Sequence, residues 1–316
     1  MAATRSPRPR PERGERDICR PVTRPDVRSI LGVERAGTLV MGIVNVTGDS
    51  FHAASRAPGL DEALALAERL LAEGADLLDV GGESTRPGAT PVALDDECAR
   101  VVPVIRELRR RGHRLPISVD TYKAEVARAA VGAGATLVND VSGGLLDADL
   151  PAAVAALGVP VVIGHLRGTP ATMTDHARYD DVVAEVRAEL AARVTRFTAV
   201  GVARERILLD PGIGFAKGAP HNLELLRRLG ELAAGSLEGL PVVLGASRKR
   251  FVAHAMAAAG LDAADDASDR LAGSLAAAVL AAERGAAVVR AHDVAATRRA
   301  LAVADAILHE VMPCGR

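Results

Sequence analysis

Short apolar runs that each close on a polar residue recur along this chain, and they constrain its fold more than any other feature. Each run is Leu-rich or β-branched and lacks clean alternation of polar and apolar residues, as in strands that are buried on both faces. The eight runs and their closing residues are VMGIVN at Asn45, LLDV at Asp79, ISVD at Asp120, LVND at Asn139 and Asp140, VVIGH at His165, ILLD at Asp210, VVLGAS at Ser247, and AVVRAH at Arg290 to His292.

Segments with helical character separate these runs. Regular alternation of strands and helices of this kind predicts an α/β fold, the (β/α)8 TIM barrel. The carboxyl ends of the strands form the active-site face of that fold, so the polar closing residues are expected to line a ligand site. Strands are predicted at 38–45, 76–80, 116–120, 136–140, 160–165, 206–210, 241–246 and 286–291, and helices at 62–74 (with Asp61 as N-cap), 93–111, 122–134, 149–157, 179–201, 222–233, 270–285 and 294–312.

Composition fits one barrel with an extension. The chain has 316 residues, of which 49% are apolar and 2% aromatic, so its core is built from Ala, Val and Leu. A net charge of −1, without a basic patch that includes aromatics, argues against nucleic-acid binding. Charged residues break the apolar runs well before the ~18 residues that a membrane span needs. Three scattered cysteines without zinc-ligand spacing indicate reduced thiols and a cytoplasmic location.

Residues 1–36 differ from the rest of the chain, because they are rich in Arg and Pro and poor in apolar residues. This predicts a disordered or loosely docked extension ahead of a single domain at 37–316. Part of the extension, near Ile30 and Leu31, is a candidate to cover the bottom of the barrel. The extension lacks the apolar stretch of a secretory signal, and its acidic residues disfavour a transit peptide.

Three loops carry more glycine than ordinary connections need: GGESTRPGAT, DPGIGFAKG and GASRKRF. Glycines allow a backbone to approach a ligand closely, and a phosphate site after the late strands recurs in barrels of this type. Arg248, Lys249, Arg290 and His292 place four potential cations at this end of the barrel. They predict an anionic substrate group, most simply a phosphate or a pyrophosphate.

Asp120, Asn139 and Asp210 are expected deeper on the same face. Carboxylates and an amide together can read the donor and acceptor edge of a planar heterocycle such as a pterin. Taken singly, each residue also has a structural explanation, because Asp210 precedes a Pro-Gly turn and Asn139 could cap a helix. Turn chemistry does not require that they converge at the ends of different strands, so a ligand pocket is the favoured interpretation.

With these motifs, the chain resembles the dihydropteroate synthases over nearly all of residues 38–311. The similar segments are MGIVNVTGDSF, DVGGESTRPGAT, SVDTYKAEVARAA, LVNDVSGG, HLRGTP, LDPGIGFAKGAPHNLELLRRL, GASRKRF, RLAGSLAAAV and RAHDV. The resemblance implies condensation of 6-hydroxymethyl-7,8-dihydropterin pyrophosphate with p-aminobenzoate in folate biosynthesis. It also implies a homodimer, Mg²⁺ beside the pyrophosphate, and inhibition by sulfonamides.

The resemblance also implies a role for each matching residue. The pterin ring is expected to contact Asp120, Asn139, Asp210 and Lys249. Asn45, Arg290 and His292 are expected at the pyrophosphate, with Asn45 near the metal. The p-aminobenzoate pocket and the mobile loops are expected to include Phe51, Thr85, Arg86, Pro87 and Ser247. Catalysis is then expected to depend on Lys249, Asp120, Asp210, Arg290 and His292.

Two features depart from the family pattern. Where the family reads Asn-x-Thr-Pro-Asp-Ser-Phe-Ser-Asp-Gly-Gly, this chain reads NVTGDSFHAAS, with Gly48 in place of Pro and with residues 52–55 changed from Ser-Asp-Gly-Gly to His-Ala-Ala-Ser. Gly164 replaces the usual Met, which is predicted to enlarge one wall of the pterin pocket. The alternative is therefore a paralogue that binds the pterin pyrophosphate but has weak or altered activity towards the second substrate. The SRK and RAHD segments disfavour another pterin-binding barrel, such as a methyltetrahydrofolate methyltransferase.

Overall fold

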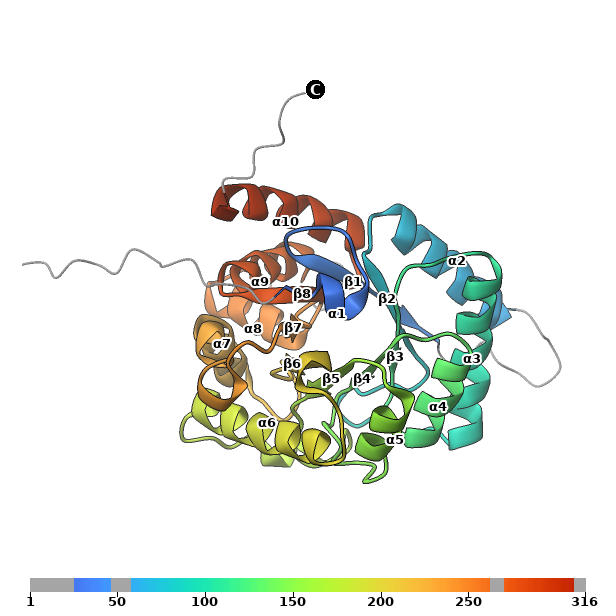
Figure 1. The fold of residues 1–316 in the computed structure, drawn as a ribbon. Coiled ribbons are helices and arrows are strands. Elements are labelled where there is room, and N and C mark those ends of the chain that lie inside the picture. Colours follow the sequence, from blue (N-terminus) through green and yellow to red (C-terminus); the bar gives the residue numbers. More distant parts are fainter. Residues whose placement is uncertain (1–25, 47–57, 262–269, 310–316) are drawn as a thin grey trace, which may run out of the picture.

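The strands of this protein form a closed parallel barrel, in chain order from β1 to β8, and helices surround it (Figure 1). The structure is a computed structural model that describes residues 26–46, 58–261 and 270–309. It confirms the predicted (β/α)8 TIM barrel. The strands are β1 (Leu39–Asn45), β2 (Leu77–Gly81), β3 (Ile117–Asp120), β4 (Leu137–Asp140), β5 (Val161–Gly164), β6 (Ile207–Asp210), β7 (Val242–Leu244) and β8 (Ala286–Ala291).

The helices follow the predicted order. The first long helix, α2, begins before the residue that was predicted to be its N-cap. Asp61 was expected as an N-cap, but α2 begins at Pro58, so Asp61 lies in the first helical turn. A carboxylate there still interacts favourably with the helix dipole. The helices are α1 (Arg28–Leu31), α2 (Pro58–Ala72), α3 (Leu94–Arg110), α4 (Ala124–Gly132), α5 (Leu150–Leu157), α6 (Val182–Ala199), α7 (Ala219–Arg227), α8 (Arg250–Ala258), α9 (Leu271–Glu283) and α10 (Val294–His309).

The sequence did not predict α8. Its nine residues, RFVAHAMAA, form a helix directly after Lys249, and they bury only Phe251 and Val252. So short a helix depends on tertiary packing for its stability. Its position makes Lys249 the N-cap residue and places the lysine at the carboxyl end of the barrel.

Apolar packing closes the amino end of the barrel. One buried cluster joins the inner side chains of the strands to residues that precede β1, and α1 lies across this end in Figure 1. The segment near Ile30 and Leu31 thus lies where the sequence suggested, and residues 27–33 pack with the barrel although they fall within the predicted extension. The cluster includes Val27, Leu31, Val33, Leu39, Met41, Leu77, Leu137, Val162, Leu208, Val243 and Val288.

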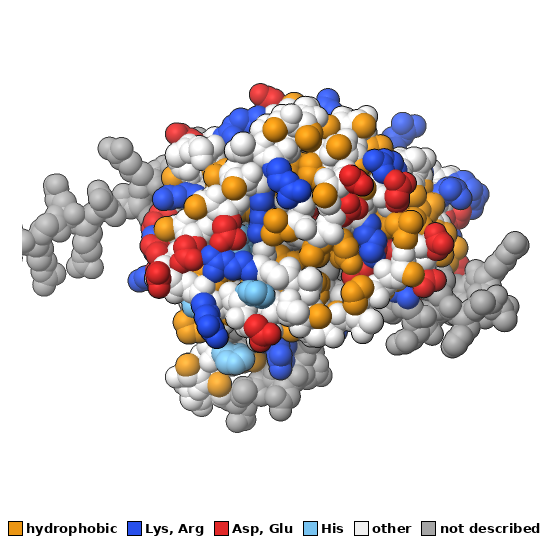
Figure 2. Space-filling model, turned by 90° about the horizontal axis from the view of Figure 1, so that it is seen from below, with side chains coloured by type: hydrophobic (Ala, Val, Ile, Leu, Met, Phe, Trp, Pro, Cys, Tyr) orange, Lys and Arg blue, Asp and Glu red, His pale blue; other side chains and the backbone are white. Residues whose placement is uncertain are grey.

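The outer surface mixes charges of both signs. Figure 2 shows one side of the molecule, on which basic and acidic side chains alternate over short distances. A single large field of one sign is therefore missing from the described part of this face. Within the described ranges, the helices are all too short or too polar to cross a membrane.

Candidate active site

The polar residues that close the strands gather at the carboxyl end of the barrel, as predicted. Asp120 ends β3 and pairs in register with Asn139 on β4, while Asp210 ends β6 and pairs with Gly164 on β5. Parallel strands bring their carboxyl ends to one rim, so these side chains converge from separate parts of the sequence. The structure therefore favours the interpretation that these residues form one ligand site, and not the alternative that each only stabilises a turn or caps a helix.

Arg290 lies at the centre of this group. Its Nε donates to Asp79 Oδ2 at 2.5 Å, and its Nη2 donates to Asp120 Oδ2 at 2.8 Å. Asn139 Nδ2 donates to the same Asp79 oxygen at 3.0 Å. Arg290 was expected among the groups that hold an anion, and here its guanidinium points to the carboxylates at the heterocycle end. The buried carboxylates need a counter-charge, which explains this orientation.

Asp79 is the residue of this cluster to which no role was assigned from sequence. It is fully buried and binds both Arg290 and Asn139 through Oδ2. Its Oδ1 is buried and accepts no hydrogen bond from the described residues. Buried oxygens usually have a partner, so an unused acceptor at this depth suggests a place for a ligand N–H or an ordered water. The polar residue inside the apolar run LLDV was the available signal.

The electrostatics of the site follow from burial. Burial raises the pKa of Asp120 to about 7, although Arg290 opposes the shift. Burial also raises the pKa of Asp210, against the influence of Lys249. The same cause lowers the pKa of Lys249 to about 8, which Asp210 opposes. The site thus holds carboxyl and amino groups whose protonation changes close to neutral pH, as is common where ligands bind.

The β6–α7 connection positions Lys249. The Lys249 ammonium donates to the carbonyl oxygen of Ile213, and it lies 4.6 Å from the centre of the Phe215 ring. Gly212 donates its N–H to Asp210 Oδ1 at 2.7 Å with a φ of 68°. A Cβ at Gly212 would lie 1.9 Å from the carbonyl oxygen of His165, so only glycine fits here. Phe215 was assigned no role from sequence. Its position in the glycine-rich segment DPGIGFAKG, in a chain with only four phenylalanines, was the available signal.

The predicted group of four cations needs a correction. Arg248 donates from Nε to Asp293 Oδ2 at 2.9 Å and from Nη2 to Oδ1 at 2.5 Å. Burial, with Arg290 and Arg248 nearby, lowers the pKa of His292 to about 4, so its imidazole is neutral near pH 7. Arg290 is already paired with two carboxylates. The structure therefore offers an anion fewer positive charges than the sequence count implied, because local pairing and desolvation are not visible in a count.

Ser247 lies beside His292 at the carboxyl end of the barrel. Its Oγ is 3.1 Å from His292 Nδ1 and accepts the His292 backbone N–H at 3.2 Å. Ser247 was expected in the pocket for p-aminobenzoate, and its hydroxyl is thus also a partner of the residue expected at the pyrophosphate. The two predicted subsites therefore meet at this pair.

The loop after β2 is anchored at both ends. Glu83 accepts from Tyr122 Oη at 2.9 Å, from Lys123 Nζ at 2.5 Å and from the Val92 N–H at 3.2 Å. Between these anchors, Thr85 is half-buried and Arg86 and Pro87 are exposed. Their exposure at the rim is compatible with the predicted role as a loop that contacts substrate.

Asn45 is exposed at the end of β1, opposite Gly81 in register. Its amide oxygen is a hard ligand of the type that Mg²⁺ accepts. The described residues contain no cluster of three or more His, Cys, Asp or Glu side chains that could hold a metal ion. Mg²⁺ usually keeps several waters and is bound by one or two carboxylates together with substrate phosphates. A carbonyl oxygen such as that of Asn45 is of the same hard type, so it is compatible with a metal held mainly by the substrate.

The expectation for Gly164 was wrong. A Cβ at this position would lie 2.6 Å from the Val141 carbonyl oxygen and 2.7 Å from the Asp140 carbonyl oxygen. The backbone after β4 therefore fills the space that a side chain would need, and no enlarged pocket wall results. The other departures, at Gly48 and residues 52–55, lie outside the described residues, and so does Phe51, which was expected in the p-aminobenzoate pocket.

This fold and this arrangement of side chains define a class of protein. Residues 41–292 match the family model for pterin binding enzymes, which is most of the chain, so the protein belongs to that family. Within it, the chain is 42% identical over 270 residues to the dihydropteroate synthase of Synechocystis sp., which covers 85% of this chain and 90% of the relative. It is 46% identical over 272 residues to the dihydropteroate synthase of Mycobacterium leprae, covering 85% and 93%.

Solved structures agree with these relatives. The Xanthomonas albilineans dihydropteroate synthase with 4-aminobenzoic acid has a TM-score of 0.77 and 46% identity, covering 88% of this chain and 94% of that chain. The same enzyme in complex with 7,8-dihydropteroate has a TM-score of 0.75 and 42% identity, covering 88% and 95%. The chain described here is a member of the dihydropteroate synthase family.

Proposed function

We propose that this protein condenses 6-hydroxymethyl-7,8-dihydropterin pyrophosphate with p-aminobenzoate to give 7,8-dihydropteroate and pyrophosphate. The observation that carries the proposal is the convergence of Asp120, Asn139, Asp210 and Lys249 at one end of the barrel, in a chain that shares more than 40% identity with dihydropteroate synthases over 85% of its length. As a transferase of this kind, it is also a candidate target of sulfonamides.

The site residues divide into two groups in this reaction. At the floor, Asp120, Asp210 and Asn139 present oxygens and an amide to the edge of the pterin ring. Asp79 orients Arg290 and Asn139 beside that ring through its Oδ2. Asn45 and His292 are proposed to contact the pyrophosphate. Arg290, whose guanidinium is bonded to Asp79 and Asp120, is proposed to do so through its remaining N–H groups. The neutral imidazole of His292 can donate a hydrogen bond there without adding charge.

The chemistry needs little acid or base catalysis from the protein. The aniline nitrogen attacks the pterin methylene, the C–O bond to pyrophosphate breaks, and the nitrogen loses a proton. Lys249 and Phe215 border the path of the aryl amine, and holding both substrates in line supplies much of the rate enhancement. The nearby carboxylates of Asp120 and Asp210 favour positive charge that develops on the methylene.

We further propose that Mg²⁺ accompanies the pyrophosphate, with Asn45 as a protein ligand. When bound, the ion would neutralise charge on the leaving group. The exposed amide of Asn45 at the end of β1 supports this assignment.

One assay tests the proposed function. Purified protein is incubated with the pterin pyrophosphate, p-aminobenzoate and Mg²⁺, and both dihydropteroate and released pyrophosphate are measured. Formation of both products in equal amounts supports the condensation. Tight binding of the pterin pyrophosphate without product formation would instead support the paralogue that the altered segment at 48–55 suggests.

The affinity of a bare pterin analogue is expected to increase from about pH 6 to about pH 8, because the ionised carboxylate of Asp120 accepts N–H groups. The pKa of Asp120 is about 7, raised by burial. A raised carboxyl pKa stabilises the empty fold below the unfolded pKa, and this contribution is lost as the pH rises through about 7. Because the pterin analogue binds more tightly at about pH 8 than at about pH 6, it is expected to raise the melting temperature more at the higher pH.

Calorimetry across this pH range is the measurement, and Asp120→Asn is the matched variant, because an amide does not titrate. Its affinity should be lower and should change less with pH. The same pH slope in both proteins would assign the titration to another group.

We also propose that the protein is a cytoplasmic homodimer. The proposal of a dimer is supported by apolar side chains that lie exposed on α9 and α10, which pack against each other. Leu280 is 43%, Val303 62% and Ile307 74% exposed. Val303→Glu with Ile307→Glu is expected to convert a dimer to a monomer in light scattering after size-exclusion chromatography, because buried charges oppose association. The control is Leu145→Glu, at a comparably exposed leucine after β4. A dimer that survives the double change would place the interface elsewhere.

A further inference from the structure

The connection between β6 and α7 contains a buried lysine for which the proposed chemistry gives no role. Lys217 is 8% exposed. Its Nζ lies 2.8 Å from His165 Nδ1, 2.9 Å from the Phe215 carbonyl oxygen and 3.1 Å from the Gly212 carbonyl oxygen. These three atoms surround the amino group of Lys217, whose N–H groups can donate to them. None of the three is a carboxylate, so this lysine binds backbone and imidazole rather than a counter-charge.

His165 links this lysine to the end of β5. Because its Nδ1 accepts from Lys217, its Nε2 carries the hydrogen and donates to Glu189 Oε2 at 3.1 Å. Glu189 in turn accepts from Arg167 Nε at 2.9 Å. The imidazole is therefore held from both sides, and it gives Lys217 a fixed anchor outside the loop that the lysine binds.

The carbonyls that Lys217 binds belong to the segment that holds Lys249. Ile213, whose carbonyl accepts from Lys249, directly follows Gly212. Phe215, whose ring lies 4.6 Å from the Lys249 ammonium, is the second residue whose carbonyl Lys217 binds. Both contacts of Lys249 are thus formed by a segment whose two ends are bonded to one buried lysine side chain.

We propose that Lys217 is a positioning residue, which holds the segment 212–215 so that the Ile213 carbonyl and the Phe215 ring orient Lys249 beside the incoming aryl amine. This inference rests on the proposed function and assigns one more residue to its second-substrate side. Of the four residues expected at the pterin ring, Asp210 and Lys249 are bonded to this segment through Gly212 and Ile213. Asp120 and Asn139 lie on β3 and β4, away from it, so two pterin contacts do not depend on Lys217. Loss of Lys217 is therefore expected to damage use of p-aminobenzoate more than pterin binding.

The test is Lys217→Met, which keeps most of the length and the apolar character of the side-chain stem and removes the donors. The kcat/KM for p-aminobenzoate is expected to fall about 10- to 100-fold, as for a small misplacement of a reacting group. The dissociation constant of a bare pterin analogue is expected to change less than about three-fold, so the variant separates the two substrates.

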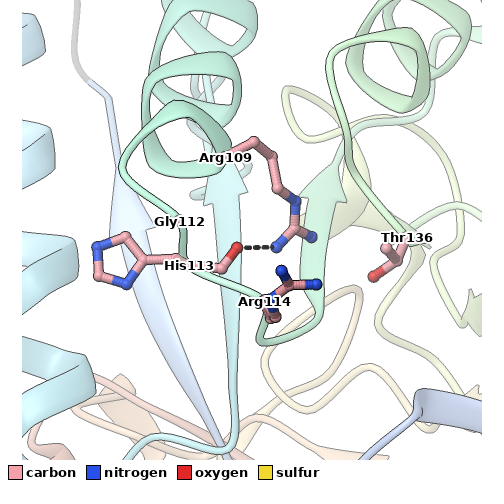
Figure 3. A pocket seen from close by; sticks show the side chains of 5 residues that line it. All are labelled: Arg109, Gly112, His113, Arg114 and Thr136. Atoms are coloured by element: carbon pink, nitrogen blue, oxygen red, sulfur yellow. Dashed lines mark hydrogen bonds between the residues drawn. The ribbon is translucent and has the colours of Figure 1, made fainter.

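Arg109→Met is the matched control. At the amino end of the barrel, Arg109 donates to the carbonyl oxygens of Gly134 at 2.9 Å and of His113 and Leu115 at 2.7 Å each. Figure 3 shows the bond to His113 in a shallow hollow that this connection lines. This variant also loses side-chain hydrogen bonds to backbone carbonyls, but far from the site. It is expected to lower the melting temperature while leaving kcat/KM within about two-fold of the wild type.

The outcomes separate the inference from the function on which it rests. If Lys217→Met lowers only the melting temperature, as Arg109→Met does, or if pterin affinity and p-aminobenzoate use fall together, the positioning role is refuted. If Lys217→Met does not fold, Lys217→Gln, whose amide keeps two donors, must show a smaller version of the same split. Absence of product with the wild-type protein contradicts the proposed function itself, and it is seen before any variant is compared.

Discussion

Arg290→Ala is expected to remove nearly all turnover and to destabilise the fold as well. Its guanidinium joins two buried carboxylates, at 2.5 Å to Asp79 and 2.8 Å to Asp120. Removing one partner of a buried ion pair costs about 3–5 kcal/mol, because the remaining charge stays buried without compensation. A loss of about 3 kcal/mol in transition-state binding alone corresponds to a ~100-fold slower reaction. Steady-state kinetics and denaturant unfolding measure the two effects.

The destabilisation should depend on pH in a defined direction. Without the guanidinium, the pKa of Asp120 is expected to rise further above its unfolded value, because burial and the charge of Asp79 remain. A group with a raised folded-state pKa stabilises at low pH, and this stability is lost as the pH rises through that pKa. The difference in unfolding free energy between variant and wild type should therefore be smaller near pH 5 than near pH 8.

Arg227→Ala is the control for this experiment, since Arg227 pairs with Glu224 on the exposed surface of α7. It should leave turnover and unfolding unchanged within error. Arg290→Lys is expected to restore little, because an ammonium cannot reproduce the two-directional contact of a guanidinium. Normal activity in Arg290→Ala would remove the residue from the site.

Lys249→Ala is the second variant with a large expected effect, and here turnover should fall without loss of the fold. Loss of a charged hydrogen-bonding group costs roughly 1.5–3 kcal/mol, which corresponds to ~10–100-fold in rate. In the wild type, burial lowers the pKa of Lys249 to about 8. If the ammonium form is required, kcat/KM should decline as the pH rises through about 8. That limb of the profile should be absent from the variant.

Arg250→Ala provides the neighbouring control, because Arg250 is exposed at the start of α8. It should keep the wild-type rate and the wild-type pH profile. Kinetics of Lys249→Ala that match those of the wild type at every pH would show that Lys249 lies outside the reacting complex.

Much of the site could be predicted from sequence, because position along a strand is a local property. Asp120, Asn139 and Asp210 each close an apolar run, and the barrel rule places the ends of such runs on one rim. The same rule implied a role for Lys249 through the glycine-rich segment before it. Two residues of the site were given no role. Phe215 lies inside the segment DPGIGFAKG, where no strand end marks it. Asp79 does close an apolar run, but its partners Arg290 and Asn139 come from segments remote in sequence.

By itself, then, the sequence determined the barrel, the order of its elements and the rim on which its polar residues meet, since hydrophobic periodicity and turn residues act over a few neighbours. Only the tertiary structure decided which charges meet: Arg290 with Asp79, across 211 positions of the chain, and Arg248 with Asp293. It also decided that His292 is neutral and that backbone fills the space beside Gly164. Pairing, desolvation and close contact depend on distances between segments remote in sequence, and those distances exist only after the barrel has closed.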